Sequence, residues 1–205
     1  MILNSEELNK LRNQVSKRVS EKRFSHILGV ENMAKTLGEA LLPDYVDELR
    51  AAALLHDISK ELSYDDQIRL LKENDFHLTD EDMSTKGVLH SFTAPIIVKR
   101  DFFDFASDNV MSAVLNHTVG SPNMSVFDKI IFISDYCEET RRYDSCVKVR
   151  NFLLEGLYDL SVCDRLKRLD EACLMSINGA IEALTQSEAF INSRMLLTKK
   201  SLLLN

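Results

Sequence analysis

Tryptophan is absent from this sequence of 205 residues, and glycine and proline are scarce, with six and three residues respectively. Folds built from many short strands need both residues at their turns, so their scarcity argues against such a sheet. Leucine, alanine, glutamate and lysine are abundant, and all four have high helix propensity. The length is sufficient for one sizeable core and short for two. The composition therefore predicts an all-α fold in a single domain.

Long apolar runs are also missing, and none approaches the ~20 residues that a membrane span requires. The first residues, MILNSEELNK, lack the basic and apolar segments of a signal peptide. The four cysteines have neither CxxC spacing nor the density of a secreted disulfide framework. We therefore expect reduced thiols, a cytoplasmic location and no membrane partner. The cysteines are Cys137, Cys146, Cys163 and Cys173.

An excess of basic charge is the third absence. The chain has 25 Lys and Arg residues against 32 Asp and Glu, which gives a net charge of −7 and a pI near 5.3. Binding of a nucleic-acid duplex usually depends on a basic face that releases counterions, so no such partner is expected. An anionic ligand would have to be held by a local group of cations.

The apolar residues recur mostly at intervals of three and four, as on one face of a helix, and no convincing strand pattern is present. Two such stripes precede Pro43, and Asp44 is expected to cap a third helix that reaches His56. A loop is expected over residues 80–87, and long helices are expected in the carboxy-terminal part. Other helices are expected to begin at Ser63, at Ser107 or Asp108, and at about Ser125.

Polar side chains interrupt these apolar stripes. In AALLHDISK, residues 52–60, a histidine and an aspartate follow an apolar helix. A buried carboxylate is costly unless it is paired or bound to metal, and a buried histidine needs hydrogen bonds. Each residue taken alone is more simply explained as a hydrogen-bonded core residue, but metal coordination explains six inward residues with one cause. These are His26, His56, Asp57, His90, His117 and Asp135.

The order of these residues also resembles that of the HD-domain metal-dependent phosphohydrolases, and within them the bacterial YqeK-type symmetrical bis(5'-nucleosyl)-tetraphosphatases. The resemblance spans about residues 20–185. It implies a compact helical HD-domain fold over residues 1–205, with a metal-binding core at about 20–140 and carboxy-terminal helices at about 146–198. An isolated HD pair would be weak support, but here HDxxK, HTxG and DxxExxR occur in order. The supporting segments are RFSHILGVENMAKTL, AALLHDISK, VLHSFTAP and AVLNHTVGSPNMSVFDKIIFISDYCEETR.

The resemblance implies a buried binuclear metal site. One ion would be held by His26, His56, Asp57 and Asp135, and Asp57 would bridge to a second ion that His90 and His117 complete. Imidazole and carboxylate ligands suit iron, manganese or cobalt without selecting among them. The family implies iron, as two divalent or mixed-valent ions.

Two such ions would lower the pKa of a bridging water and clamp phosphate oxygens. The substrate implied is a dinucleoside polyphosphate: diadenosine tetraphosphate, cleaved symmetrically to two ADP by attack of a metal-bound hydroxide. Asp57 and Lys60 are the expected catalytic residues. Lys60 lies one helical turn after Asp57, where it could reach a phosphate oxygen. The expected substrate-binding residues are Arg23, Lys60, Thr118, Gly120 and Arg141.

Four of these residues have alternative interpretations. Gly120, together with Thr118 before it, could simply end a helix, Arg23 could lie at the rim of the site, and Lys60 could be a solvated surface residue. Outside this set, Asp128 could orient a ligand histidine or form a salt bridge on its helix, and His77 is expected on the surface.

Two other functions remain open at this stage. An HD phosphohydrolase could act instead on a mononucleotide, a cyclic dinucleotide or an alarmone, since the histidines of the second ion are compatible with each. A noncatalytic HD module could bind nucleotide and use its metals structurally, although Lys60 and the complete ligand set argue against it. Helical stripes do not distinguish a core from a dimer interface, so a homodimer is compatible with the sequence.

Overall fold

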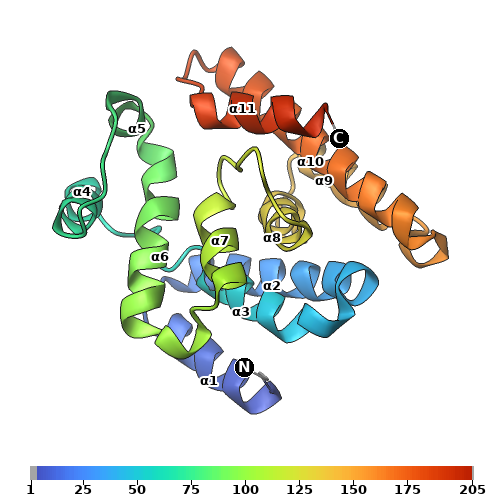
Figure 1. The fold of residues 1–205 in the computed structure, drawn as a ribbon, viewed down its shortest axis with the longest axis horizontal. Helices are drawn as coiled ribbons and strands as arrows, with labels where there is room; N and C mark the ends of the chain where they lie inside the picture. The colour runs from blue at the N-terminus through green and yellow to red at the C-terminus, as the bar shows by residue number, and fades with distance from the viewer. Residues whose placement is uncertain (1–3, 205) are drawn as a thin grey trace.

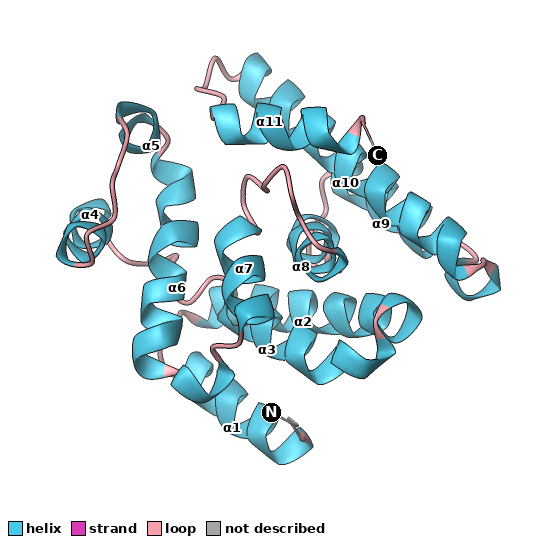
Figure 2. Ribbon diagram, viewed as in Figure 1, coloured by secondary structure: helices cyan, strands magenta, loops and turns pink. Residues whose placement is uncertain are grey.

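The computed structural model describes residues 4–204, which form helices and no strand (Figure 1, Figure 2), and the all-α prediction is confirmed. The α-helices are α1 (Ser5–Ser16), α2 (Glu21–Leu41), α3 (Val46–Leu55), α4 (Tyr64–Glu73), α5 (Asp80–Ser84), α6 (Leu89–Asp101), α7 (Asp108–Asn116), α8 (Val126–Cys137), α9 (Asp144–Leu154), α10 (Val162–Gln186) and α11 (Ser193–Leu202). Short 3-10 turns are η1 (Pro43–Tyr45), η2 (Lys86–Val88), η3 (Phe103–Phe105) and η4 (Leu157–Asp159).

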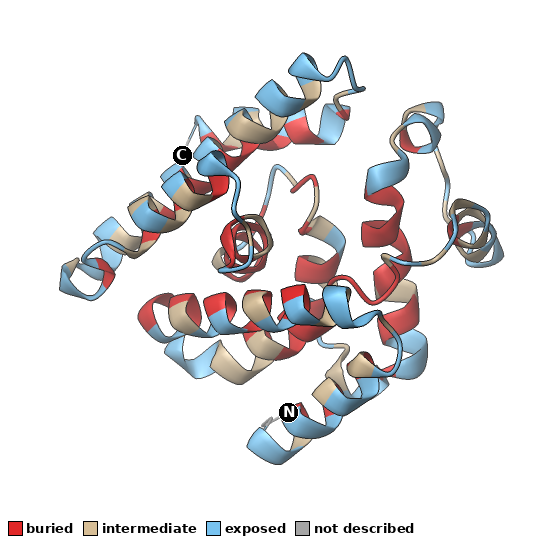
Figure 3. Cartoon of the chain, turned by 180° about the vertical axis from the view of Figure 1, so that it is seen from behind, coloured by how far each residue is buried: buried red, intermediate tan, exposed pale blue. Residues whose placement is uncertain are grey.

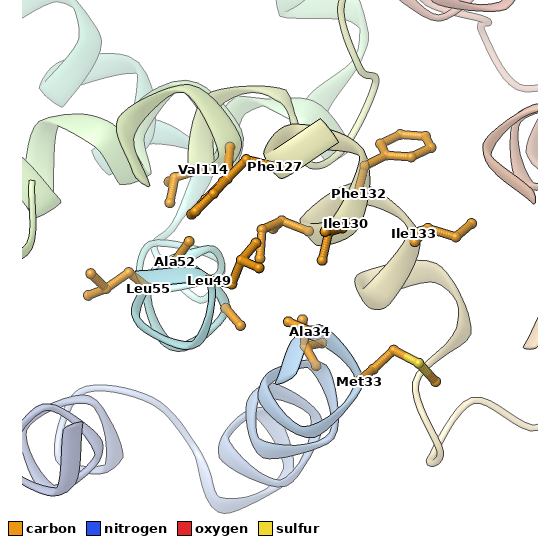
Figure 4. Packing of buried hydrophobic residues seen from close by; sticks show 14 of the residues in the cluster. Met33, Ala34, Leu49, Ala52, Leu55, Val114, Phe127, Ile130, Phe132 and Ile133 are labelled. Atoms are coloured by element: carbon orange, nitrogen blue, oxygen red, sulfur yellow. The ribbon is translucent and has the colours of Figure 1, made fainter. Parts of the chain in front are cut away.

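The core is formed where α2, α3, α7 and α8 pack against one another. Figure 4 shows side chains of α2, α3 and α8 meeting in one apolar layer, among them Ala34, Leu49 and Ile130. Leu49 and Ile130 are fully buried. Burial of such side chains contributes about 1.5–3 kcal/mol each, so this layer is the main support for the helix ends that carry the polar residues. Figure 3 shows the buried surfaces concentrated on these central helices.

Most of the expected helix starts are confirmed. The hydroxyls of Ser63, Ser107 and Ser125 each accept a hydrogen bond from the backbone N–H three residues later, as N-cap side chains do. The second stripe ends at Leu41, before Pro43, as expected.

Two local predictions are wrong. Asp44 does not cap α3: it lies in η1, and the N-cap of α3 is Tyr45, which makes no side-chain cap hydrogen bond. Pro43 occupies the first position of η1, so the chain enters α3 through a 3-10 turn. The expected loop contains α5 and η2, because Thr79 and Asp82 form a reciprocal capping box that begins a short helix.

The carboxy-terminal helices cover one side of the core. The long helix α10 packs against α8 and α9, and α11 packs against α10 (Figure 1). All four cysteines are free in the part of the chain that the structure describes. Among residues 4–204, no helix combines the length and the apolar character needed to cross a bilayer.

Candidate metal centre

The six residues predicted as metal ligands lie together, in the first or last turns of their helices or directly after a helix. His26 lies on α2, His90 on α6 and Asp135 on α8, while His56 and His117 are the C-cap residues of α3 and α7. Asp57 follows His56 directly, and its side chain is only 4% exposed. The packing of α2, α3, α7 and α8 therefore brings together residues that are more than one hundred positions apart in the sequence.

The first group of donor atoms surrounds one oxygen of Asp57. Asp57 Oδ2 lies 3.5 Å from His56 Nε2 and 3.6 Å from His26 Nε2. Asp135 Oδ1 lies 3.0 Å from His26 Nε2 and 3.9 Å from His56 Nε2. These separations bring the four side chains predicted to hold the first ion around one point.

The second group surrounds the other oxygen of the same carboxylate. Asp57 Oδ1 lies 3.3 Å from His90 Nε2 and 3.7 Å from His117 Nε2. The two Nε2 atoms are 2.9 Å apart. Each oxygen of Asp57 thus faces a different pair of histidines, which is the arrangement expected of a carboxylate shared between two cations.

The hydrogen bonds of the imidazoles fit cations in both groups. Nδ1 of His56 donates to the carbonyl of Ala53 at 2.6 Å, and Nδ1 of His117 donates to the carbonyl of Val114 at 2.7 Å. A carbonyl only accepts, so the neutral rings carry their proton on Nδ1 and present a lone pair at Nε2. His56 Nε2 is buried and has no hydrogen-bond partner among the described residues. Such a lone pair, directed at carboxylates, fits a metal ligand.

A seventh residue, Glu138, supports His26 and was not assigned a role from the sequence. Nδ1 of His26 lies 3.1 Å from Glu138 Oε1, and the buried carboxylate also accepts from the backbone N–H and the hydroxyl of Thr140, both at 2.6 Å. A Cβ on Gly29 would lie 2.3 Å from Glu138 Oε2. Glycine at position 29 therefore leaves the space through which Glu138 reaches α2.

Three cationic side chains lie around these carboxylates. Arg23 donates to Asp57 Oδ2 at 2.7 Å, and Arg141 donates to Asp135 Oδ1 at 3.0 Å. The Lys60 ammonium lies 3.2 Å from both ring nitrogens of His90. These contacts give the acidic chain the local positive charge that an anionic ligand requires.

The remaining predicted residues have different surroundings. The Thr118 hydroxyl lies 3.1 Å from Nε2 of both His90 and His117. Gly120 is buried, has φ +72°, and a Cβ there would lie 2.5 Å from Cγ2 of Thr198 on α11. The same threonine donates to the carbonyl of Val119 at 3.0 Å. These contacts favour the helix-ending interpretation of Gly120 and fasten the loop after His117 to α11.

Two further expectations have clear outcomes. Asp128 forms a capping box with Ser125 at the start of α8, rather than the expected contact with a histidine or a salt bridge on its helix. The capping pattern S-x-x-D was present in the sequence and accounts for this role. His77 is exposed, as expected.

The pKa values of two histidines in the centre are shifted in opposite directions. Burial lowers the pKa of His26, but the neighbouring carboxylates of Asp135 and Glu138 outweigh it and raise that pKa to about 9. Burial and the neighbouring His117 and Lys60 hold the pKa of His90 well below its usual range. For Asp57, burial raises the pKa, but the surrounding histidines lower it well below the ordinary value. The first group therefore contains more carboxylates than the second, and these carboxylates favour the charged form of a neighbouring imidazole.

A model of the family described as "HD domain" matches residues 23–140, which is more than half of the chain. The chain belongs to the HD domain family, and it is an HD-domain hydrolase. Within this family it is similar to enzymes named "Bis(5'-nucleosyl)-tetraphosphatase, symmetrical". The relative from Halalkalibacterium halodurans is 30% identical over 138 residues, which cover 66% of this chain and 71% of the relative. The relative from Staphylococcus aureus is 26% identical over 164 residues, which cover 78% of this chain and 82% of the relative.

A solved structure from Clostridium acetobutylicum shares the fold. It is described as a predicted HD superfamily hydrolase involved in NAD metabolism, and it superimposes with a TM-score of 0.82. The two chains are 26% identical, and the match covers 95% of this chain and 96% of the other. The similarity therefore includes the carboxy-terminal helices as well as the part matched by the family.

Proposed function

We propose that this protein hydrolyses diadenosine tetraphosphate symmetrically to two molecules of ADP. The observation that carries the proposal is the shared carboxylate of Asp57, whose two oxygens face two separate pairs of histidines. The relatives from Halalkalibacterium halodurans and Staphylococcus aureus, both named as symmetrical tetraphosphatases, support the choice of substrate.

The donor atoms fit two metal ions. His26, His56, Asp57 and Asp135 would hold one, and Asp57, His90 and His117 would hold the other. These nitrogen and oxygen donors suit iron, manganese or cobalt, with iron as the ion that we propose. Bound there, such ions would supply Lewis acidity toward phosphate oxygens and would activate a water molecule as the nucleophile.

The protein side chains around the two groups would bind and orient the polyphosphate. Arg141 presents its planar guanidinium beside Asp135, where it could bind two phosphate oxygens at once. Arg23 contacts Asp57 in the first group, and Lys60 contacts His90 in the second group. Both cations would neutralise further phosphate oxygens. The Thr118 hydroxyl, beside His90 and His117, can donate to a phosphate oxygen in the same place.

The reaction consumes one water and gives two ADP, because attack at a phosphorus next to the central bridging oxygen leaves two phosphates on each nucleoside. The test is anaerobic incubation of the iron- or manganese-loaded protein with diadenosine tetraphosphate, followed by chromatography of the products. Two ADP per substrate, abolished by Asp57→Ala, are expected. AMP plus ATP would reject symmetrical cleavage, and no turnover with two ions bound would reject this substrate.

A further inference from the structure

A cavity of about 340 Å³ adjoins the metal centre. One part of its wall is polar and includes Asp135 and Arg141, which are hydrogen-bonded to each other. The other part is mainly apolar and aromatic and comes from α8, α10, α11 and the N-cap of α9. Its members include Phe132, Tyr136, Tyr143, Ile177, Ala180 and Met195.

The missing side chain of Gly179 sets the size of this cavity. Gly179 lies on α10 in the cavity wall, and a Cβ there would lie 2.7 Å from the Tyr136 hydroxyl and 3.6 Å from Cβ of Ser145. A larger residue at this position would push the Tyr136 ring aside or occupy the cavity. Glycine therefore lets α10 approach α8 closely while the space beside the metal centre stays open.

The shape and chemistry of the wall specify an amphipathic ligand. Arg141 and the metal centre can hold an anionic group, while the apolar wall can hold a flat ring that leaves water. The volume falls at the lower end of the range of roughly 300–1,000 Å³ that is typical of small-molecule sites. We infer that this cavity holds one nucleoside of the substrate, with its base against the apolar wall and its 5'-phosphates directed to Arg141 and the metal centre. This inference rests on the proposed function.

Tyr143 is the residue that would stack on the base. Tyr143 is the N-cap residue of α9 and lines the cavity. Its side chain is 73% exposed and makes no cap hydrogen bond, so the ring is available to a ligand. An aromatic ring beside an apolar cavity can cover a base with its face, and such stacking tolerates different bases. The aromatic and apolar residues that follow residue 140 lie outside the part matched by the HD family. Recognition of the nucleoside would therefore come largely from the carboxy-terminal helices.

The experiment compares the binding of ADP and of inorganic diphosphate to the manganese-loaded protein by calorimetry. Two variants act on the cavity: Tyr143→Ala removes the ring, and Ala183→Leu narrows the cavity from an exposed position on α10. Their matched controls are Tyr158→Ala, at a tyrosine that is 58% exposed, and Asn178→Leu, at an exposed position of α10. Neither control position lines this cavity.

Wild type is expected to bind ADP at least ten-fold more tightly than diphosphate. Each cavity variant should weaken ADP binding about ten-fold and leave diphosphate binding unchanged, and neither control should alter either constant. Equal binding of the two ligands by wild type, or equal effects of the cavity variants and the controls, would overturn the inference. If the ADP preference and its loss are observed without turnover of diadenosine tetraphosphate, the cavity assignment stands and the proposed reaction fails. If turnover occurs while the variants leave ADP binding and KM unchanged, the reaction stands and the cavity assignment fails.

Discussion

The two halves of the metal centre share Asp57 but differ in the charge around them. The half formed by His26 and His56 includes a second carboxylate, Asp135, and Glu138 lies behind His26. Two guanidinium groups also contact this half, Arg23 at Asp57 and Arg141 at Asp135. Among residues 4–204, Asp57 is the one carboxylate paired with His90 and His117, and the Lys60 ammonium lies 3.2 Å from His90. The comparison teaches that similar imidazole pairs need not hold their ions equally well, because the carboxylates and cations behind them set the local field.

The largest effect is expected from Asp57→Ala, which removes the carboxylate common to both halves. We expect loss of both ions and of several kcal/mol of transition-state stabilisation, which corresponds to about 10³-fold or more in kcat. Metal content by mass spectrometry and the rate of ADP formation are the measurements. The control is Asp104→Ala, at an exposed aspartate in η3. Retention of two ions by Asp57→Ala would show that the halves do not share this carboxylate.

The second prediction separates the halves. His90→Ala should leave one ion, held by the half that contains Asp135, and should lower kcat by about 10²-fold or more, because the two-ion clamp is lost. In wild type, stepwise chelation should remove the ion at His90 and His117 first, since that half has fewer carboxylates. The measurement is the number of ions retained at increasing chelator concentration. Simultaneous loss of both ions would contradict the difference between the halves.

The third prediction concerns Glu138, the carboxylate that contacts His26 from behind the first group. Glu138→Gln removes the charge that fixes His26, and changes of this kind cost about 10–100-fold in metal affinity or activity. The ion in the half that contains His26 should be weakened, while the other half should change less. Glu139→Gln is the matched control, because Glu139 is exposed and accepts a hydrogen bond from the exposed Asn32 at 3.1 Å, away from the histidines. Equal metal affinity in Glu138→Gln and wild type would remove Glu138 from the centre.

The sequence singled out six side chains that the structure brings together, and it assigned no role to the carboxylate behind them, for a physical reason. The inward histidines and Asp57 stood out because polar residues on an apolar stripe need a partner. Glu138 is the glutamate of the DxxExxR motif, but its contact with His26 depends on the missing side chain of Gly29 on another helix, which the motif does not show. The cavity was equally invisible, since Gly179 and Tyr143 acquire meaning only when α10 lies against α8. Contacts between helices distant in sequence decide such features, and periodicity does not encode them.

The last prediction concerns folding stability, which should depend on pH in the metal-free protein. The pKa of His26 is raised to about 9 by Asp135 and Glu138 despite the opposing effect of burial, so its proton is bound more tightly in the folded state than in the unfolded one. The resulting stability, on the order of 3 kcal/mol at most, is fully present below about pH 6.5 and is lost as the pH rises to about 9.

Denaturant unfolding of the chelated protein between pH 6 and pH 9.5 would measure this loss, with His26→Gln as the comparison. Burial lowers the pKa of Lys60, which acts in the opposite sense in this range, and the difference between wild type and His26→Gln cancels that contribution. The difference should shrink as the pH rises. A constant difference across the range would show that His26 is not protonated in the metal-free fold.

The loop after His117 is held by a hydrogen bond from α11, and this contact has a consequence for folding during synthesis. Thr198 holds the carbonyl of Val119, and α11 is synthesised long after the helices that carry the histidines. While the chain grows, the donor atoms can therefore gather before this loop has its final support. We expect a nascent or truncated chain that lacks α11 to bind the ion at His90 and His117 weakly. Completion of the metal centre would then depend on a helix that contributes no ligand to it.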